Sequence, residues 1–356
     1  MPSVTLVFLS LSLAAWGCAA RASQETESSE NGVLDATSSE TASQGTPAHE
    51  APSHEAQPPD ALSVDSGPLT PATPGAAPFG RPVPAGVVQY DPLVEASGLV
   101  ASRTHPGVLW SHNDSGDGPH LFALTTNGRH LGVFTLDGAE ARDWEDIALG
   151  PGPEPGVDYL YAGDIGDNEA QRDLTFVYRV AEPAVDIDQK PVETTLTGVS
   201  TITLRYPDGP SDAETLLVDP LTGDLYVITK RSTEVAIFRA AAPQSTTDVI
   251  VMERAGTLSL ARVPFAPAAG QGAVGGDISP SGLEVLLKTY LEVYYWKRDS
   301  GAEPLFAHPS VTLPYVPEPQ GEAIAWAADG SGYFTLSEEA PSIPATLYFY
   351  PRQITK

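Results

Sequence analysis

The sequence predicts an all-β fold, a β-propeller with five blades, and three observations support this prediction. A short motif recurs five times between Glu95 and the C-terminus, and repeats at such a period are typical of radial or solenoid folds. From Val87 onward, β-branched and aromatic runs alternate with Gly, Pro, Asn and Asp, which is the pattern of short strands joined by turns. No window shows sustained helical periodicity, so we expect essentially no helix.

Each copy of the motif places one oxygen-bearing side chain directly before a short apolar run. The five copies are Ala96–Leu99, Trp144–Ile147, Ala213–Leu216, Gly276–Ser279 and Gly321–Ile324. Their polar positions are Ser97, Glu145, Glu214, Asp277 and Glu322, of which all but Ser97 are carboxylates. In a propeller the first strand of each blade lines the central channel, so these five side chains are expected to converge on one axis.

The remaining strands of each unit follow the motif in a common order. Second strands are predicted at residues 108–111, 159–162, 225–229, 285–288 and 332–336. Third strands rich in aromatic residues are predicted at residues 121–124, 176–179, 236–239, 293–296 and 347–350. Residues 201–204 and 248–252 are examples of a fourth strand, and four antiparallel strands make one propeller blade.

The blade count depends on how the ring closes. The fifth unit lacks a fourth strand because the chain ends soon after Tyr350, and an N-terminal strand near residues 87–90 is expected to supply it. This closure would leave no free edge strand. Six blades would require a degenerate blade within the two longest repeats, where residues 184–193 and 258–272 are predicted to be extra loop.

The N-terminal part is predicted to be an export signal followed by a tether. Residues 1–17 form a signal peptide with an apolar run from Val4 to Trp16, too short to span a bilayer. Residues 15–18 resemble a bacterial lipobox, which implies lipidation of Cys18, the one cysteine of the chain. The alternative is an ordinary secretory signal with an incidental cysteine, because Ala15 and Trp16 depart from the pattern and no basic residue precedes the apolar run.

Three regions are therefore expected: the signal at residues 1–17, a tether at 18–84 and the propeller at 85–356. The tether is acidic and rich in Ser, Thr, Pro and Ala, and it cannot bury enough apolar surface to order itself. Localisation is predicted to be the cell envelope, through the lipid anchor, or the exterior if Cys18 is not lipidated. With Cys18 used or removed, the mature domain can form no disulfide.

The formal net charge of −27 excludes some partners and favours others. Such a charge disfavours nucleic acid and anionic lipid surfaces, and suits an exported protein that meets divalent cations. We expect a monomer that contacts the membrane through its N-terminal lipid and binds a small anionic ligand or a cell-surface partner.

The motif ring is a candidate calcium site. Four carboxylates around one axis repel one another unless some are protonated or a cation compensates them. Calcium suits oxygen ligands in an irregular cage, whereas zinc is unexpected because the histidines are scattered and the predicted propeller domain has no cysteine. The structural alternative is that the carboxylates cap turns and pair with Lys230, Arg231 and Lys288.

The ends of the second strands are expected on the same face as the motif ring. The candidate ligand-binding residues there are Asp114, Asp164, Lys230, Arg231, Lys288 and Glu338. Their basic members would form an anion-binding edge beside the cation, with charge balance as the structural alternative. His112, the histidine predicted on this face, is the candidate acid or base, since imidazole titrates near neutral pH. No nucleophile elbow, phosphate loop or zinc-protease motif is present.

Several segments carry a resemblance to known proteins. Residues 143–148, 163–168, 212–214, 229–230, 276–280 and 320–325 resemble segments of bacterial exported propeller-like proteins, which implies the fold and no particular reaction. More loosely, the chain is similar to five-bladed, calcium-dependent apyrase propellers. That likeness implies axial calcium ligands at Ser97, Glu145, Glu214 and Glu322, with Asp277 less well matched, and the catalytic motifs of the apyrases have no counterpart in this sequence.

The sequence thus favours an exported, lipid-anchored propeller whose axial calcium pocket binds a small phosphorylated or carboxylated ligand. Such a pocket could support calcium-dependent phosphoester hydrolysis. The alternative is a non-catalytic module for protein or glycan recognition with a purely structural acidic ring, and the fold by itself does not decide between them.

Overall fold

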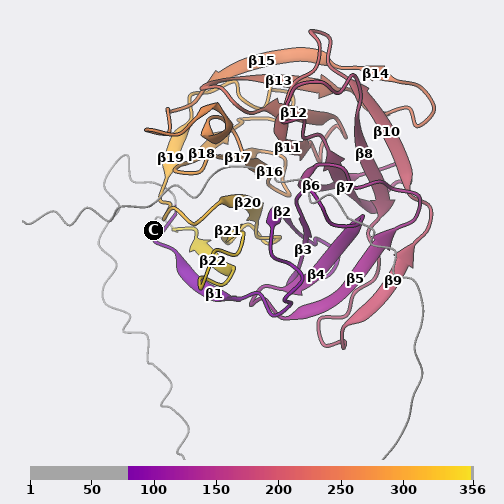
Figure 1. The fold of residues 1–356 in the computed structure, drawn as a ribbon, viewed down its shortest axis with the longest axis vertical. Coiled ribbons are helices and arrows are strands. Elements are labelled where there is room, and N and C mark those ends of the chain that lie inside the picture. Colours follow the sequence, from indigo (N-terminus) through magenta and orange to yellow (C-terminus); the bar gives the residue numbers. More distant parts are fainter. Residues whose placement is uncertain (1–78, 354–356) are drawn as a thin grey trace, which may run out of the picture. The chain divides into compact units, whose positions relative to one another are not determined.

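The computed structural model describes residues 79–353. These residues form five β-sheets arranged around a common axis (Figure 1), and their one helical element is the 3-10 turn η1 (Ala268–Gly270). The prediction of an all-β, five-bladed propeller is confirmed. No helix in this described range is long and apolar enough to cross a membrane.

Each sheet is one blade, and its strands follow one another from the axis outward. Blade 1 contains β2 (Ala96–Ala101), β3 (Val108–Asn113), β4 (His120–Thr125), β5 (His130–Leu136) and β9 (Val192–Leu196). Blade 2 contains β6 (Trp144–Pro151), β7 (Asp158–Asp164), β8 (Thr175–Ala181), β10 (Ser200–Arg205) and β14 (Ile250–Val251). Blade 3 contains β11 (Ala213–Val218), β12 (Leu225–Thr229), β13 (Glu234–Ala240) and β15 (Glu253–Ser259).

The last two blades complete the ring. Blade 4 contains β16 (Gly275–Ile278), β17 (Glu284–Lys288), β18 (Val293–Lys297) and β19 (Val311–Leu313). Blade 5 contains β20 (Gly321–Trp326), β21 (Gly332–Ser337), β22 (Thr346–Pro351) and β1 (Val83–Val87). The innermost strands β2, β6, β11, β16 and β20 lie near the centre of Figure 1, and each packs against the inner strands on either side of it.

Apolar clusters fill the five gaps between neighbouring blades. Trp110 and Tyr178, for example, belong to the cluster between blades 1 and 2, and Phe238 and Tyr161 to the one between blades 2 and 3. The other three clusters join blades 3 and 4, blades 4 and 5, and blades 5 and 1. Because the apolar residues of each inner strand lie in these gaps, its polar residues are left to the axis.

The N-terminal strand closes the ring, as the sequence predicts. β1 pairs antiparallel with β22, and Phe79 forms a bridge with Arg352 just before it. The strand begins at Val83, a few residues earlier than the predicted segment at 87–90. Phe79 is buried, with its ring centroid 5.2 Å from that of Tyr333 and 5.7 Å from that of Trp326, so this segment forms part of the propeller core.

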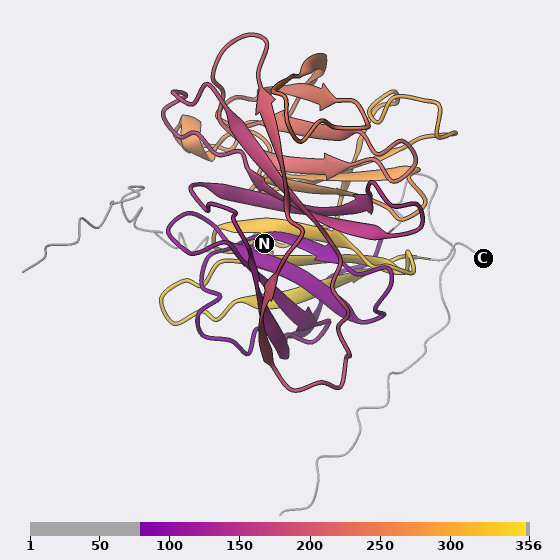
Figure 2. The same ribbon diagram turned by 90° about the vertical axis from the view of Figure 1, so that its right-hand side faces the viewer.

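Two segments of the long repeats take positions that the sequence does not reveal. Residues 192–196, at the end of the predicted extra loop, form β9, which pairs parallel with β5 and widens blade 1. The predicted fourth strand at residues 248–252 is wrong for blade 3: β14 pairs parallel with β10 of blade 2, and β15 takes the fourth place in blade 3. Figure 2 faces this outer edge, where β5, β9 and β10 lie.

The predicted signal peptide, Cys18 and nearly all of the tether lie outside the described residues. Cys18 lipidation and export therefore stay predictions, as do the domain boundaries at residues 17 and 84.

Candidate metal centre

Four of the five motif residues occupy β-bulges at the start of an inner strand. The strand pairing shifts register around Ser97, Glu145, Glu214 and Glu322, so that each of these residues is left without a partner in the ladder. A bulge turns its side chain away from the ordinary alternation of a strand. The four side chains therefore come together at the same end of the inner strands, where β3, β7, β12 and β21 also end.

Blade 4 departs from this scheme. β16 pairs with β17 without a register shift, and Asp277 lies further along its strand than the four bulge residues do in theirs. Its Oδ2 accepts a hydrogen bond of 2.8 Å from the backbone N–H of Trp326, on the neighbouring inner strand. Burial raises the pKa of Asp277 to about 7. The structure thus places Asp277 as a link between blades 4 and 5, apart from the other four.

Lys288 supports the bulge of blade 5. Its side chain is fully buried, and its Nζ donates to the carbonyl of Gly321 and, at 3.3 Å, to that of Thr289. The ammonium lies 4.7 Å from the ring centroid of Tyr315, and burial lowers its pKa to about 8. Lys288 therefore holds the backbone next to Glu322 and does not form an exposed edge for anions.

Lys230 is placed among the bulge carboxylates. Its Nζ forms an ion pair with Oε1 of Glu214 and donates to the hydroxyl of Tyr290 at 3.1 Å. Tyr290 in turn donates to Oε1 of Glu322 at 2.6 Å, and Ser97 Oγ lies 3.1 Å from Oε2 of the same carboxylate. Burial alone would lower the pKa of Lys230, but the carboxylates, Glu214 foremost, outweigh it and raise the pKa.

Asp114, Asp143 and Glu145 form the other side of the site. One carboxylate oxygen from each lies within 4.8 Å of the others, a spacing at which the three could hold one metal ion. Glu145 exposes 3% of its surface, and Asp114 and Asp143 are half-buried. Within residues 79–353, no Lys or Arg forms an ion pair with any of the three.

The carboxyl groups here raise one another's pKa values. Burial, followed by the charges of Glu322 and Asp143, raises the pKa of Asp114 to about 8. Burial and Asp114 raise the pKa of Glu145 well above its usual value, and burial with Glu322 raises that of Glu338 to about 9. The set is called the axial cluster below and comprises Ser97, Asp114, Asp143, Glu145, Glu214, Lys230, Tyr290, Glu322 and Glu338.

One buried acceptor in the axial cluster has no partner. Oε2 of Glu214 is shielded from solvent and receives no hydrogen bond, although Oε1 of the same carboxylate pairs with Lys230. An unpartnered carboxylate oxygen in the interior is costly unless a cation or a proton reaches it. This observation, independent of the Asp114–Asp143–Glu145 group, also points to a cation.

Contacts from blades 2 and 3 fix the loop between β7 and β8, residues 165–174, which bounds the site. Asp164 is fully buried, pairs with Arg172 at 2.8 Å and accepts from the backbone N–H of Asp143 at 3.2 Å. Arg231 pairs with Asp212, whose other oxygen accepts from the backbone of Asp167 in the same loop. Asp164 and Arg231 are both predicted to bind ligand. In the structure each forms an ion pair that holds this loop beside the axial cluster.

Gly166 lies against the two acidic side chains that the loop surrounds. A Cβ at this position would come within 2.1 Å of Oε1 of Glu145 and 2.5 Å of Oδ2 of Asp143. Only a residue without a side chain leaves room for both carboxylates to approach each other. The glycine is thus explained by close packing against the site.

His112, the predicted acid or base, lies in the interior between β3 and β6. It is fully buried, its ring meets that of Trp144 edge to face at 5.7 Å, and its Nδ1 lies 2.7 Å from the carbonyl oxygen of Asn113. Burial lowers its pKa to about 4, so the imidazole is neutral near pH 7. Its Nε2 is buried and has no hydrogen-bond partner among the described residues.

The donors of the axial cluster suit a hard divalent cation. Carboxylate and hydroxyl oxygens are the ligands of calcium, which accepts roughly 6–8 of them in irregular geometry. Sequence reasoning missed Asp143 and Tyr290 because neither lies in the motif or at the end of a second strand. The run Asp143-Trp144-Glu145-Asp146 was the available signal, since it places three carboxylates beside one bulge.

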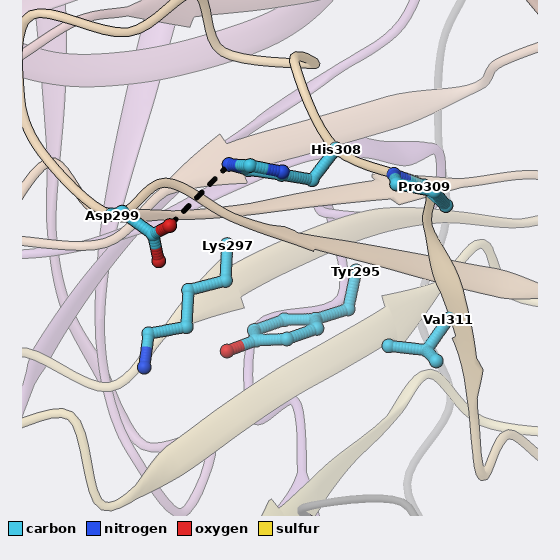
Figure 3. A pocket seen from close by; sticks show the side chains of 6 residues that line it. All are labelled: Tyr295, Lys297, Asp299, His308, Pro309 and Val311. Carbon is cyan, nitrogen blue, oxygen red and sulfur yellow. Dashed lines mark ion pairs between the residues drawn. The ribbon is translucent and has the colours of Figure 1, made fainter.

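A second acidic group lies on the outside of blade 4. Asp299, Glu303 and His308 follow β18, with His308 Nε2 at 3.2 Å from Glu303 and 3.8 Å from Asp299. Figure 3 shows Asp299 and His308 at one side of a surface hollow that Tyr295, Lys297 and Val311 also line. His308 and Asp299 are exposed, and Glu303 is half-buried.

Comparisons with known proteins add little to this geometry. No protein-family model matches the chain, and no curated protein matches its sequence. Among solved structures, hydrazine synthase from Kuenenia stuttgartiensis is similar over 76% of this chain and 98% of that chain, with 11% sequence identity and a TM-score of 0.39. A likeness this distant carries no argument about the axial cluster.

Proposed function

We propose that this protein is an exported, lipid-anchored β-propeller that binds one calcium ion in its axial cluster and, through that ion, a small anionic ligand. The observation that carries the proposal is the group formed by Asp114, Asp143 and Glu145, whose oxygens lie within 4.8 Å of one another without a basic partner among the described residues. When these carboxyl groups are ionised, two unit charges at this distance repel by about 3 kcal/mol at an effective dielectric near 20. A divalent cation removes that repulsion for all three pairs at once.

The ion rather than the basic residues would hold the anionic ligand. Lys230 and Arg231 are committed to Glu214 and Asp212, and Lys288 is fully buried. A phosphorylated or carboxylated molecule would therefore supply the oxygens that complete the coordination of calcium. Hydrolysis of a phosphoester at the ion is the reaction such a site could support, with the metal withdrawing charge from the phosphoryl oxygens.

Calcium titration of the purified chain tests the first step. Binding to the folded state alone raises the melting temperature, so calcium should stabilise the protein and EDTA should reverse the effect. Glu145→Gln should weaken binding at least tenfold, whereas Glu253→Gln, on the exposed outer strand β15, should leave it unchanged. A melting temperature that does not respond to calcium would refute the proposed site.

The ligand is tested once binding is established. A panel of phosphate esters and small carboxylates is added with calcium and with EDTA, and binding and hydrolysis are followed separately. Molecules that bind in calcium and fail to bind to Glu145→Gln support the proposal. Binding that is the same in EDTA would place the ligand elsewhere.

A second candidate function is recognition of a protein or glycan at the cell surface. Phe265 favours it: 99% of its surface is exposed, at the tip of a loop that follows β15. Buried Gln271 braces that loop, donating to the carbonyls of Val263 and Ala266 and accepting from the N–H of Val263. If this function is correct, Phe265→Ala abolishes capture of the partner, whereas Glu145→Gln leaves it intact.

A further inference from the structure

Lys230 reaches the axial cluster from a fixed backbone. Its N–H donates to the carbonyl of Asp212 at 3.0 Å, and the residue forms a bridge with Gly272. The next residue, Arg231, has a left-handed φ of 68° and donates its N–H to Gln271 at 2.9 Å. The lysine side chain is buried, and its Nζ lies 5.2 Å from the ring centroid of Tyr290. Backbone contacts of Lys230 and Arg231, together with the ring of Tyr290, therefore fix where the ammonium lies.

The charge of Lys230 is distributed unequally over the axial cluster. Its ion pair is with Glu214, and the hydroxyl of Tyr290 connects it to Glu322. No such contact joins Lys230 to Asp114 or Asp143 within the described range. The side of the axial cluster that contains Glu214 therefore has a positive charge of its own, whereas the side formed by Asp114, Asp143 and Glu145 has no ion pair with a basic residue in the described range.

We propose that Lys230 is a tethered counter-ion that reserves the Asp114–Asp143–Glu145 side for one divalent cation and limits how tightly that cation binds. This inference rests on the proposed function, since it concerns the same site. The ammonium pairs with Glu214 and is connected to Glu322 through the hydroxyl of Tyr290, so the ion meets a less negative cluster than the acidic side chains alone would form. It also repels the arriving cation, because both charges lie within one buried group of carboxylates.

Removing the charge of Lys230 should increase the affinity of the protein for calcium. Lys230→Met keeps the length and much of the volume of the lysine while deleting its charge. Calcium should then bind at least tenfold more tightly, which corresponds to about 1.4 kcal/mol, with one ion per chain as in the wild type. Lys230→Arg retains the charge and should stay within about threefold of the wild-type affinity, well under that difference.

Calorimetric titration of the purified full chain with calcium chloride measures these affinities. Lys297→Met is the matched control, because it deletes the same charge from an exposed position on β18. Its affinity for calcium should equal that of the wild type within the error of the titration. The net charges of the two Lys→Met variants are identical, so a general change in charge cannot explain a difference between them.

The outcomes separate this inference from the proposed function. If the wild type binds no calcium, both fail. If the wild type binds and Lys230→Met binds equally or more weakly while folded, the counter-ion role alone is overturned. If Lys230→Met is unfolded in EDTA, circular dichroism follows its refolding with calcium: recovery at saturating calcium supports the inference, because the ion then binds and stabilises the fold without Lys230, and failure to recover overturns it.

Discussion

Asp277→Asn provides a direct measure of what burial of a carboxyl group costs this propeller. The pKa of Asp277 is raised by burial to about 7, from an ordinary value of 3.8, although the N–H of Trp326 bonds to the carboxylate. Between these two values the folded state holds a proton that the unfolded chain releases. Stability contributed by this group is therefore present at low pH and is lost as the pH rises towards 7.

The size of the effect follows from the shift. The full cost of ionising Asp277 in the folded state is about 4 kcal/mol, and some of it is already present at pH 5, where the unfolded chain is ionised. Asparagine does not titrate, and its amide oxygen can still accept from Trp326. Between pH 5 and pH 8 the variant should therefore gain about 2–3 kcal/mol relative to the wild type.

Urea denaturation followed by tryptophan fluorescence, in EDTA at both pH values, measures this change. The amide NH₂ that asparagine introduces can carry its own cost, but that cost is the same at both pH values and cancels from the comparison. Asp329→Asn is the control without a pH response, because the hydroxyl and N–H of Ser331 hold the pKa of Asp329 below its ordinary 3.8, so the folded and the unfolded chain are both ionised there at pH 5 and at pH 8. A difference between Asp277→Asn and the wild type that stays constant from pH 5 to pH 8 would refute the reasoning.

Three further predictions follow from single contacts of the site and of the ring closure. Gly166→Ala should weaken calcium binding at least tenfold in a calorimetric titration, because its Cβ would push apart Glu145 and Asp143, whereas Asp277→Asn should leave the affinity unchanged. Ser97→Ala should lower the free energy of unfolding by about 1–2 kcal/mol, since it removes a hydroxyl that donates to the carbonyl of Glu145 at 2.6 Å and lies 3.1 Å from a carboxylate oxygen of Glu322. Phe79→Ala should cost about 3–5 kcal/mol in urea denaturation, whereas Phe265→Ala, at an exposed position, should change stability by less than about 0.5 kcal/mol.

The sequence was sufficient to predict the ring, because its information lies in local patterns. Each motif joins one polar side chain to an apolar run, and the apolar residues must enter the gaps between blades, as Leu99, Ile147 and Leu216 do. The polar side chain of each motif is then left to face the axis. This reasoning holds wherever one face of a strand is buried, which explains why the inner strands were predicted better than the outer ones.

The outer strands depend on contacts that a local pattern does not contain. β9 and β14 pair parallel with strands that belong to earlier parts of the chain, and no turn residue marks those pairings. Likewise the direction of Lys230 depends on a left-handed residue and a bridge to Gly272. The predicted basic edge required Lys230, Arg231 and Lys288 to face solvent together, whereas each has its own buried or half-buried partner.

Departures from five-fold repetition make the axial cluster asymmetric. Blade 4 has no bulge, so Asp277 binds the backbone of Trp326, and blade 1 carries Ser97, a donor, where three other blades carry glutamate. Lys230 then pairs with Glu214 of blade 3 and is connected to Glu322 of blade 5 through the hydroxyl of Tyr290. The uncompensated charge is left beside blades 1 and 2, from which Asp114, Asp143 and Glu145 come. A calcium ion in this propeller is therefore expected off the axis, next to the start of β6, and a structure with calcium on the exact centre of the ring would contradict this account of the charges.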